Sequence, residues 1–282
     1  MSDSSDTLPP LREVIKRLGL SARKSLGQNY LMDFNLTRKI ARAVPALGDS
    51  LVMEIGPGPG GLTRALLLEG AGKVVAIEKD ERFQPALEEI KAAYPDRFSF
   101  FIADATKFDP RELPGTGKRP IRIAANLPYN VGTHLLVGWM SGAWPPWFSS
   151  LTILLQREVA ERIIAKPGTS AYGRLSILAQ WRAAARIIFD IPATAFTPQP
   201  KVQSSLVEIL AMEPLMTEIK IADLSRVTAA AFGQRRKMLR SSLKSLFPDP
   251  ESILRSLDIM PEARPEQLSI EDFLKMAREL PH

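Results

Sequence analysis

The chain of 282 residues contains no cysteine and only two histidines, His134 and His282. Disulfides and thiolate metal sites are therefore excluded, and a histidine-based metal centre is disfavoured as well. The absence of cysteine also suits a reducing compartment. We therefore expect a protein that holds no metal.

The chain also lacks an apolar segment of the kind that crosses a membrane. One long uncharged stretch, 134–156, is interrupted by glycines and prolines, which divide it into helix, loop and strand. Residues 1–10 are polar and acidic, so we expect a disordered tail there rather than a signal or transit peptide. We expect a cytoplasmic protein with no membrane partner.

The chain carries more basic than acidic residues. Lysine and arginine number 37 against 31 acidic residues, for a net charge of +6. This excess favours a polyanionic partner. One basic cluster follows the fifth expected strand, and the other is expected in the first C-terminal helix: Arg157, Arg162, Lys166 and Arg174; Arg235, Arg236, Lys237, Arg240 and Lys244. Phosphate contact and simple solvation both account for such clusters.

Short apolar runs alternate with helical patterns through most of the chain. We expect strands at 51–55, 74–77, 98–102, 121–125, 151–155 and 205–210, with helices between most of them. This alternation predicts an α/β fold with right-handed crossovers and a mostly parallel sheet. From Ala222 onward the periodicity is helical only. We therefore predict a tail at 1–10, a main domain at 11–213 and a small helical domain at 214–282.

A glycine-rich loop, Gly56-Pro57-Gly58-Pro59-Gly60-Gly61, joins the first of these strands to a helix. It satisfies the dinucleotide pattern G-x-G-x-x-G, and Glu78 lies near the distance expected for a ribose-binding acid. Prolines in both spacer positions leave fewer N–H groups for a pyrophosphate, which disfavours NAD. Asp104, which follows the third strand, could accept from an adenine amino group. Two such acids suit S-adenosylmethionine, which has no phosphate.

The tetrapeptide Asn126-Leu127-Pro128-Tyr129 follows the fourth strand. Ligands of open α/β sheets bind at this end of the strands. The Asn126 side-chain oxygen and the Pro128 carbonyl could each accept one N–H of an exocyclic base amine, while Tyr129 stacks on the base. The alternative is a strand and turn with a buried tyrosine.

The chain resembles the RsmA/KsgA family of ribosomal RNA adenine N6,N6-dimethyltransferases from about Leu11 to its end. The set of motifs is specific when found together and in this order. The matching segments are Gly27-Gln28-Asn29-Tyr30-Leu31, Glu54-Ile55-Gly56-Pro57-Gly58 with Leu62-Thr63, Glu78, Asp104, Asn126-Leu127-Pro128-Tyr129, and Phe196-x-Pro198-x-Pro200-Lys201-Val202 with Ser204. Tyr30 departs from the pattern, since the family usually has Phe there.

The resemblance implies a Rossmann-like class I S-adenosylmethionine-dependent methyltransferase, with a mostly parallel seven-stranded sheet and a small helical RNA-binding domain. Cofactor contacts would come from Gln28, Asn29, Leu31, Gly56, Gly58, Glu78, Asp104 and Asn126. Asn126 and Pro128 would orient the target amine, with Tyr129 and Phe196 stacking on the flipped adenine. The candidate RNA contacts are Arg157, Arg162, Arg174, Arg235, Arg236, Lys237 and Arg240.

The implied substrate is 16S rRNA within the small ribosomal subunit or its precursor. Two adjacent adenosines near its 3′ end would each be dimethylated, and we expect a monomer. One alternative is a large-subunit rRNA methyltransferase of the erythromycin-resistance type, which Leu127 and the Gly27-Gln28-Asn29 segment disfavour. Another is a non-catalytic RNA-binding assembly factor, against which the intact acids Glu78 and Asp104 argue. A third, an NAD-dependent dehydrogenase, lacks an obvious catalytic His or Tyr-Lys pair.

Overall fold

The structure, a computed structural model, describes residues 7–23, 27–108 and 120–281. Contacts divide the chain into two compact units. The first comprises Met1–Gly138, Pro146–Arg157 and Arg186–Leu210, and the second comprises Trp139–Pro145, Glu158–Ala185 and Ala211–His282. No helix of the described residues is long and apolar enough to span a membrane.

The first unit is built on a seven-stranded sheet with the strand order β4-β3-β2-β5-β6-β9-β7. The strands are β2 (Leu51–Ile55), β3 (Lys73–Glu78), β4 (Phe98–Ile102), β5 (Ile121–Asn126), β6 (Ser150–Gln156), β7 (Ala183–Ile191) and β9 (Ser204–Ala211). Neighbours from β4 to β6 pair in parallel, and β9 runs antiparallel to β6. The predicted α/β fold with a mostly parallel seven-stranded sheet is confirmed.

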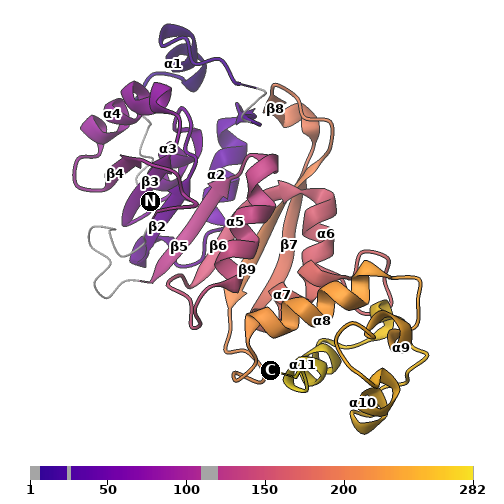
Figure 1. Ribbon diagram of the computed structural model, residues 1–282. Helices are drawn as coiled ribbons and strands as arrows, with labels where there is room; N and C mark the ends of the chain where they lie inside the picture. The colour runs from indigo at the N-terminus through magenta and orange to yellow at the C-terminus, as the bar shows by residue number, and fades with distance from the viewer. Residues whose placement is uncertain (1–6, 24–26, 109–119, 282) are drawn as a thin grey trace. The chain divides into compact units, whose positions relative to one another are not determined.

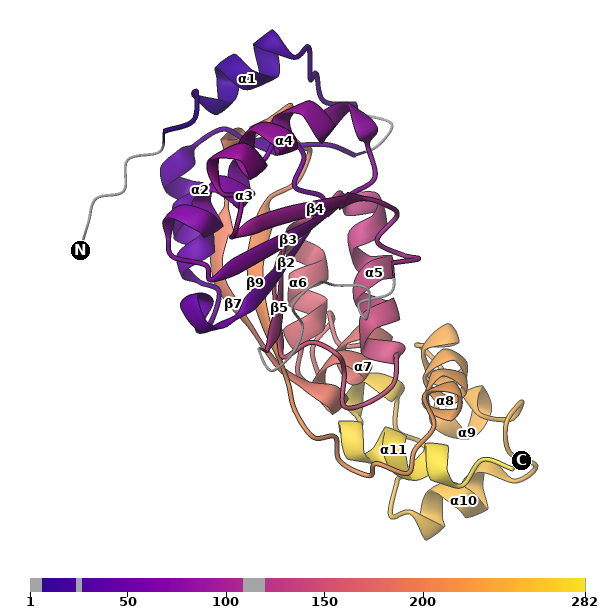
Figure 2. The ribbon, with the colours of Figure 1, turned by 90° about the vertical axis from the view of Figure 1, so that its left-hand side faces the viewer.

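Helices cover both faces of this sheet. Figure 2 shows α2 (Phe34–Arg42), α3 (Gly61–Leu68) and α4 (Gln84–Ala93) on one face, and α5 (Tyr129–Ser141) on the other. Every residue of β2 is buried, and so is every residue of β3 after Lys73. This double covering explains why the central strands read as apolar runs rather than alternating patterns. Short 3-10 helices are η2 (Leu47–Asp49), η3 (Glu81–Phe83) and η5 (Ala193–Ala195).

The N-terminal segment is attached to the first unit by contacts that are distant in sequence. It contains α1 (Leu11–Arg17) and β1 (Tyr30–Leu31), which pairs antiparallel with β8 (Phe196–Thr197). Of the predicted disordered tail, 1–10, residues 1–6 lie outside the described part. In the rest of it, the Arg64 side chain donates to the carbonyls of Leu8 and Pro9 at 3.2 and 2.7 Å.

The second unit is helical in its described part. Its elements are α6 (Arg157–Ile164, of which Arg157 belongs to the first unit), α7 (Arg174–Arg182), α8 (Ile221–Gly233), α9 (Leu239–Ser242), α10 (Pro250–Ser256), η6 (Pro265–Gln267) and α11 (Ile270–Arg278) (Figure 1). We predicted residues 214–282 as a separate domain, but Glu158–Ala185 belongs to the same unit. The reason is packing, since Tyr172 and Trp181 share one buried cluster with Leu224 and Phe273.

Candidate active site

Strand register brings three predicted site residues to one level at the carboxyl edge of the sheet. Ile55 of β2 is opposite Ile77 of β3 and Ala125 of β5. The next residues, Gly56, Glu78 and Asn126, therefore lie side by side where three parallel strands end. Ligands bind at this edge in open α/β sheets.

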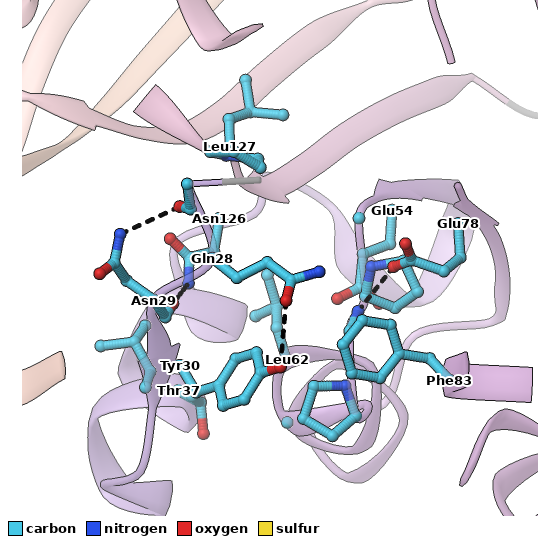
Figure 3. Close-up of a pocket in the computed structure, with 18 of the residues that line it drawn as sticks. Gln28, Asn29, Tyr30, Thr37, Glu54, Leu62, Glu78, Phe83, Asn126 and Leu127 are labelled. Carbon is cyan, nitrogen blue, oxygen red and sulfur yellow. Dashed lines mark hydrogen bonds between the residues drawn. The ribbon is translucent and has the colours of Figure 1, made fainter. Parts of the chain in front are cut away.

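A pocket opens at this edge (Figure 3). Its lining comes from the N-terminal segment, the glycine loop and the ends of β3 and β5: Leu11, Gly27, Gln28, Asn29, Tyr30, Leu31, Thr37, Glu54, Gly56, Pro57, Gly58, Pro59, Gly61, Leu62, Glu78, Phe83, Asn126, Leu127, Pro128 and Tyr129. None of these described lining residues is a lysine, arginine or histidine. The pocket is therefore acidic, which suits a ligand with cationic groups and disfavours a pyrophosphate.

The glycine loop adopts the backbone conformation that only glycine accepts readily. Gly56 has a φ of 66° and Gly58 a φ of 56°, both in the left-handed region. The Gly56 N–H donates to the Ile77 carbonyl at 2.9 Å, and the Gly58 N–H donates to Glu78 Oε2 at 3.0 Å. The loop thus follows the strand edge closely and fixes the position of the Glu78 carboxylate.

Glu78 is buried with only 6% of its surface exposed. Its Oε1 accepts the Asp80 N–H at 2.7 Å, and its Oε2 accepts the Gly58 N–H. Burial raises the pKa of Glu78, while these backbone N–H groups lower it in part. A carboxylate has about four lone-pair positions. After these two bonds it can still accept from a pair of hydroxyls, as a ribose diol requires.

Glu54 also lines the pocket, although sequence reasoning gave it no role. It lies in the middle of buried β2, is 1% exposed, and its Oε2 accepts from Thr63 Oγ1 at 2.6 Å. Burial raises the pKa of Glu54 to about 8, with a smaller upward contribution from Glu78. The signal that could have revealed it is a carboxylate inside an otherwise apolar strand.

A polar network holds the Gln28 side chain. Its Nε2 donates to Asp80 Oδ2 at 3.1 Å, and its Oε1 accepts the Arg23 N–H at 2.9 Å and the Tyr30 hydroxyl at 3.4 Å. Arg82 in turn donates to both Asp80 oxygens at 2.5–3.1 Å, and lowers the pKa of Asp80 to about 2. The predicted pocket residue Gln28 is therefore engaged with protein partners.

Arg82 also connects this network to the N-terminal segment. Its guanidinium donates to the Ser21 carbonyl at 3.3 Å and to Gln28 Oε1 at 3.4 Å. Sequence reasoning assigned no site role to Arg82 or Asp80, because their contacts join segments more than fifty residues apart. The hydroxyl by which Tyr30 departs from the family pattern makes a contact within the same network.

Asn126 is oriented by the backbone of the N-terminal segment. Its Nδ2 donates to the Asn29 carbonyl at 3.1 Å, which leaves Oδ1 as the end that accepts from a ligand. Tyr129, the first residue of α5, lines the pocket beside it, and its hydroxyl shares a 2.5 Å hydrogen bond with Ser204 Oγ of β9. Burial raises the pKa of Tyr129. Both residues therefore line the pocket, and their roles in orienting and stacking a base remain predictions.

Pro128 lines the pocket, but its carbonyl is engaged elsewhere. That oxygen accepts the N–H groups of Val131 and Gly132, each at 3.0 Å. Two lone pairs are thereby used, so this arrangement does not offer the Pro128 carbonyl to a substrate amine. Leu127 lines the pocket as well, and Figure 3 shows its side chain pointing away from Gln28 and Tyr30. Its backbone therefore borders the pocket, which makes its carbonyl the candidate for a second acceptor.

Two other predicted site residues do not line the pocket. Asp104 accepts from Lys79 Nζ at 2.8 Å and from Thr106 at 2.7 and 3.0 Å, contacts that hold its pKa well below the usual range. Phe196 is 3% exposed and lies in the core, paired with Leu31 across β1 and β8. The structure does not bring these side chains to the pocket, and their roles remain predictions.

The basic residues are arranged differently from the prediction. We expected Arg235 to Lys244 in the first C-terminal helix, but α8 ends at Gly233, and α9 begins only at Leu239. Tertiary structure also supplies acids: Arg235 lies 3.8 Å from Glu266, Arg240 lies 3.1 and 3.7 Å from Glu251 and Glu262, Arg157 lies 3.4 Å from Asp190, and Arg162 pairs with Glu158. Arg174, Arg236 and Lys237 are exposed and make no ion pair with another described residue.

The chain is similar to proteins of one enzyme family over almost its whole length. The model of the family described as "Ribosomal RNA adenine dimethylase" matches residues 19–281. A protein of Ruegeria sp. (strain TM1040), "Ribosomal RNA small subunit methyltransferase A", is 58% identical over 276 residues, covering 98% of each chain. The protein of the same name from Chelativorans sp. (strain BNC1) is 55% identical, covering 98% of this chain and 100% of its own.

The chain is also similar to solved structures of rRNA and adenosine methyltransferases. A dimethyladenosine transferase from Plasmodium falciparum superposes with a TM-score of 0.72 at 26% identity, covering 86% of this chain and 94% of that one. The 23S rRNA methyltransferase ErmE superposes with a TM-score of 0.65 at 25% identity, covering 89% and 99%. Both superpositions include most of the pocket-bearing unit and extend beyond it.

We predict that Arg82→Met loosens the pocket wall formed by Gly27–Leu31. The change leaves the Asp80 carboxylate without its cation and removes one donor to Gln28, at a local cost of about 1–3 kcal/mol. Backbone amides of this segment should exchange hydrogen faster, as measured by mass spectrometry.

The matched control is Arg42→Met. It removes an arginine of α2 that pairs with Glu69 at 3.0 Å. Exchange in Gly27–Leu31 should be unchanged in that variant. Equal exchange in both variants would show that Arg82 does not order the pocket wall.

Proposed function

Because the chain belongs to the ribosomal RNA adenine dimethylase family, we propose that it transfers methyl groups from S-adenosylmethionine to adenine N6 in 16S rRNA. Two adjacent adenosines near the 3′ end are each dimethylated during small-subunit biogenesis. The observation that carries this proposal is the alignment of Asn126 with the acidic pocket at one edge of the sheet. This alignment supports the proposal, because an acceptor for an amine would then lie next to a site for a cationic methyl donor.

The residues of the pocket fit S-adenosylmethionine. Glu78 offers acceptors for the ribose hydroxyls, and the left-handed glycines leave room for close backbone approach. The cofactor carries a sulfonium and an ammonium group, which suits a pocket with two buried carboxyls and no described basic lining residue. NAD would instead bring two phosphates next to these carboxyls, at a cost in electrostatic repulsion.

The residues of the chain act mainly by orientation. S-adenosylmethionine, when bound, supplies an electrophilic methyl group. In the first transfer to each adenosine, Asn126 Oδ1 accepts one N–H of the adenine amine and the Leu127 carbonyl accepts the other, which turns the nitrogen lone pair towards the methyl group. No general base is required, because the alkylated nitrogen is acidic enough to lose its proton to water.

The target base must leave its stack to reach Asn126. We assign stacking on the extruded adenine, an interaction worth roughly 1–3 kcal/mol per base, to the Tyr129 ring. The hydroxyl of this ring is bound to Ser204. Phe196 would need to leave the core in order to add a second stacking surface, so we assign this role to Tyr129 first.

We assign RNA contact to the exposed basic residues of each unit, and we propose that the protein acts as a monomer in the cytoplasm on the small subunit or its precursor. The choice of small-subunit over large-subunit RNA is supported by the names of the relatives that are 55–58% identical. ErmE, the large-subunit enzyme among the structural neighbours, is only 25% identical.

The deciding experiment measures methyl transfer from labelled S-adenosylmethionine to undermethylated small subunits, with large-subunit RNA in parallel. We expect dimethyladenosine at adjacent positions near the 3′ end of the small-subunit RNA. Label confined to large-subunit RNA would replace the proposal with the erythromycin-resistance activity. Label in neither RNA would favour a non-catalytic assembly factor.

Asn126→Ala should abolish methyl transfer while cofactor binding partly survives. The variant removes the acceptor that orients the amine but leaves Glu78 and the glycine loop in place. Transfer is measured under single-turnover conditions, and cofactor affinity by calorimetry. Turnover at the wild-type rate would exclude the role of Asn126 in orienting the amine.

Replacing Arg236 and Lys237 together by alanine should weaken binding of the small-subunit RNA and flatten its dependence on salt. Each lost phosphate contact lowers the slope of log affinity against log salt by about 0.7–0.9. The control is Lys275→Ala, which removes a lysine paired with Glu271 at 3.0 Å. Identical slopes for the wild type and both variants would mean that Arg236 and Lys237 are only solvated.

A further inference from the structure

Helix α1 has a basic face to which the proposed mechanism gives no role. Its apolar side is packed onto the pocket-bearing unit, since Val14 is buried and Ile15 and Leu18 pack against the same core cluster. The other side carries Arg12 and Lys16, which are both exposed. These two cations are four residues apart and are therefore neighbours on the surface of the helix.

The charges of Arg12 and Lys16 are not compensated within the described part of the chain. Neither side chain makes an ion pair with a described residue, whereas Arg17 of the same helix pairs with Glu89 of α4 at 2.7 Å. Like charges four residues apart destabilise a helix slightly. An anion bound to both side chains would remove this repulsion.

The basic face of α1 lies next to the acidic pocket. Leu11, the first residue of the helix, lines both the pocket and an adjoining cavity of about 350 Å³, and so do Leu31 and Gly61. Arg12 and Arg64 line this second cavity, and no aspartate or glutamate is found among its described lining residues. Basic side chains therefore begin where the acidic pocket ends.

The position of α1 is fixed by contacts with α3 as well as by its ion pair with α4. Arg64 of α3 donates to the carbonyls of Leu8 and Pro9, just before the helix begins. Leu11 packs closely on Gly61, where an added Cβ would lie 3.0 Å from Leu11 Cδ2. Figure 2 shows α1 lying next to α4. The helix thus holds its cations in a defined place relative to the pocket.

An acidic pocket repels the phosphates on either side of a base that enters it. Glu54 and Glu78 are buried in the pocket, and none of its described lining residues is basic. The extruded adenine must reach Asn126 while its phosphates stay outside. Cations beside the pocket offset this repulsion, and they also release counter-ions from the RNA when they bind it.

We propose that the face of α1 formed by Arg12 and Lys16 binds the sugar–phosphate backbone of the substrate RNA beside the target adenosine. Each side chain takes one phosphate group. This contact belongs to the N-terminal segment, so it is distinct from the basic residues that follow β6 and from those of the helical unit. The inference rests on the proposed function in taking RNA as the substrate, and it adds no step to methyl transfer.

The first test replaces Arg12 and Lys16 together by glutamine, which has a similar helix propensity. Binding to undermethylated small subunits is measured without cofactor at several salt concentrations. The loss of two phosphate contacts should lower the slope of log affinity against log salt by about 1.4–1.8. If the two proteins bind equally at 1 M salt, this change weakens binding about 25- to 60-fold at 0.1 M.

The matched control combines Arg42→Gln and Lys91→Gln. It removes the same charge from α2 and α4, where these cations pair with Glu69 at 3.0 Å and with Glu88 at 4.0 Å. Its slope should equal that of the wild type. An unchanged slope in the α1 variant would overturn the proposal. So would an equal fall in both variants, because net charge alone would then account for it.

A second measurement leaves both cations in place. The chain has no cysteine, so Glu13→Cys provides a single attachment point on α1 for an iron–EDTA group that cleaves nearby RNA. We expect cleavage of the small-subunit RNA close to the adenosines that the wild type methylates. The same group attached through Arg42→Cys is the control. No cleavage near these adenosines, or the same pattern from both positions, would contradict the proposal.

Failure of the proposed function would give a different result. The wild type would then methylate no adenosine of the small-subunit RNA, whereas the salt dependence of binding is measured without methyl transfer. In the methylation assay, the effect of replacing Arg12 and Lys16 should appear in the KM for RNA, with the affinity for S-adenosylmethionine unchanged. A lower kcat with an unchanged KM would instead assign α1 to the cofactor pocket and overturn the proposal.

Discussion

Parallel pairing of β3, β2 and β5 is the constraint on which the site depends. The register puts Ile55 opposite both Ile77 and Ala125, so the three strands end at the same level of the sheet. A slip of one residue would turn each side chain to the opposite face. Glu54 and Glu78 would then no longer meet at one pocket, and the glycine loop would not reach the carboxylate that it holds.

The N-terminal segment completes the site from outside the sheet. Asn29 orients Asn126 through its carbonyl, and Gln28 is tied to Asp80 and Arg82 near the end of β3. These bonds connect parts of the chain that are distant in sequence, so they form only when the sheet and the segment are both in place. Preorganised polar groups of this kind cost little to align when the substrate arrives.

The pocket combines burial with acidity, and this combination distinguishes its chemistry from that of dinucleotide sites. Two carboxyls are nearly inaccessible, and burial raises the pKa of each. A folded protein keeps such an arrangement at some cost in stability. A ligand with cationic groups would offset that cost.

Apolar runs and glycine placement in the sequence determined the class of fold, the position of the glycine loop and the tetrapeptide at the end of β5, because these features depend on local backbone chemistry. The positions of Glu78 and Asn126 at the ends of their strands followed from the rule that parallel strands end at one edge of the sheet. Tertiary structure alone decided that Phe196 lies in the core, that the Pro128 carbonyl is engaged, that Glu158–Ala185 joins the helical unit, and that Glu54 faces the pocket. Each of these depends on contacts between residues distant in the chain, which no local pattern records.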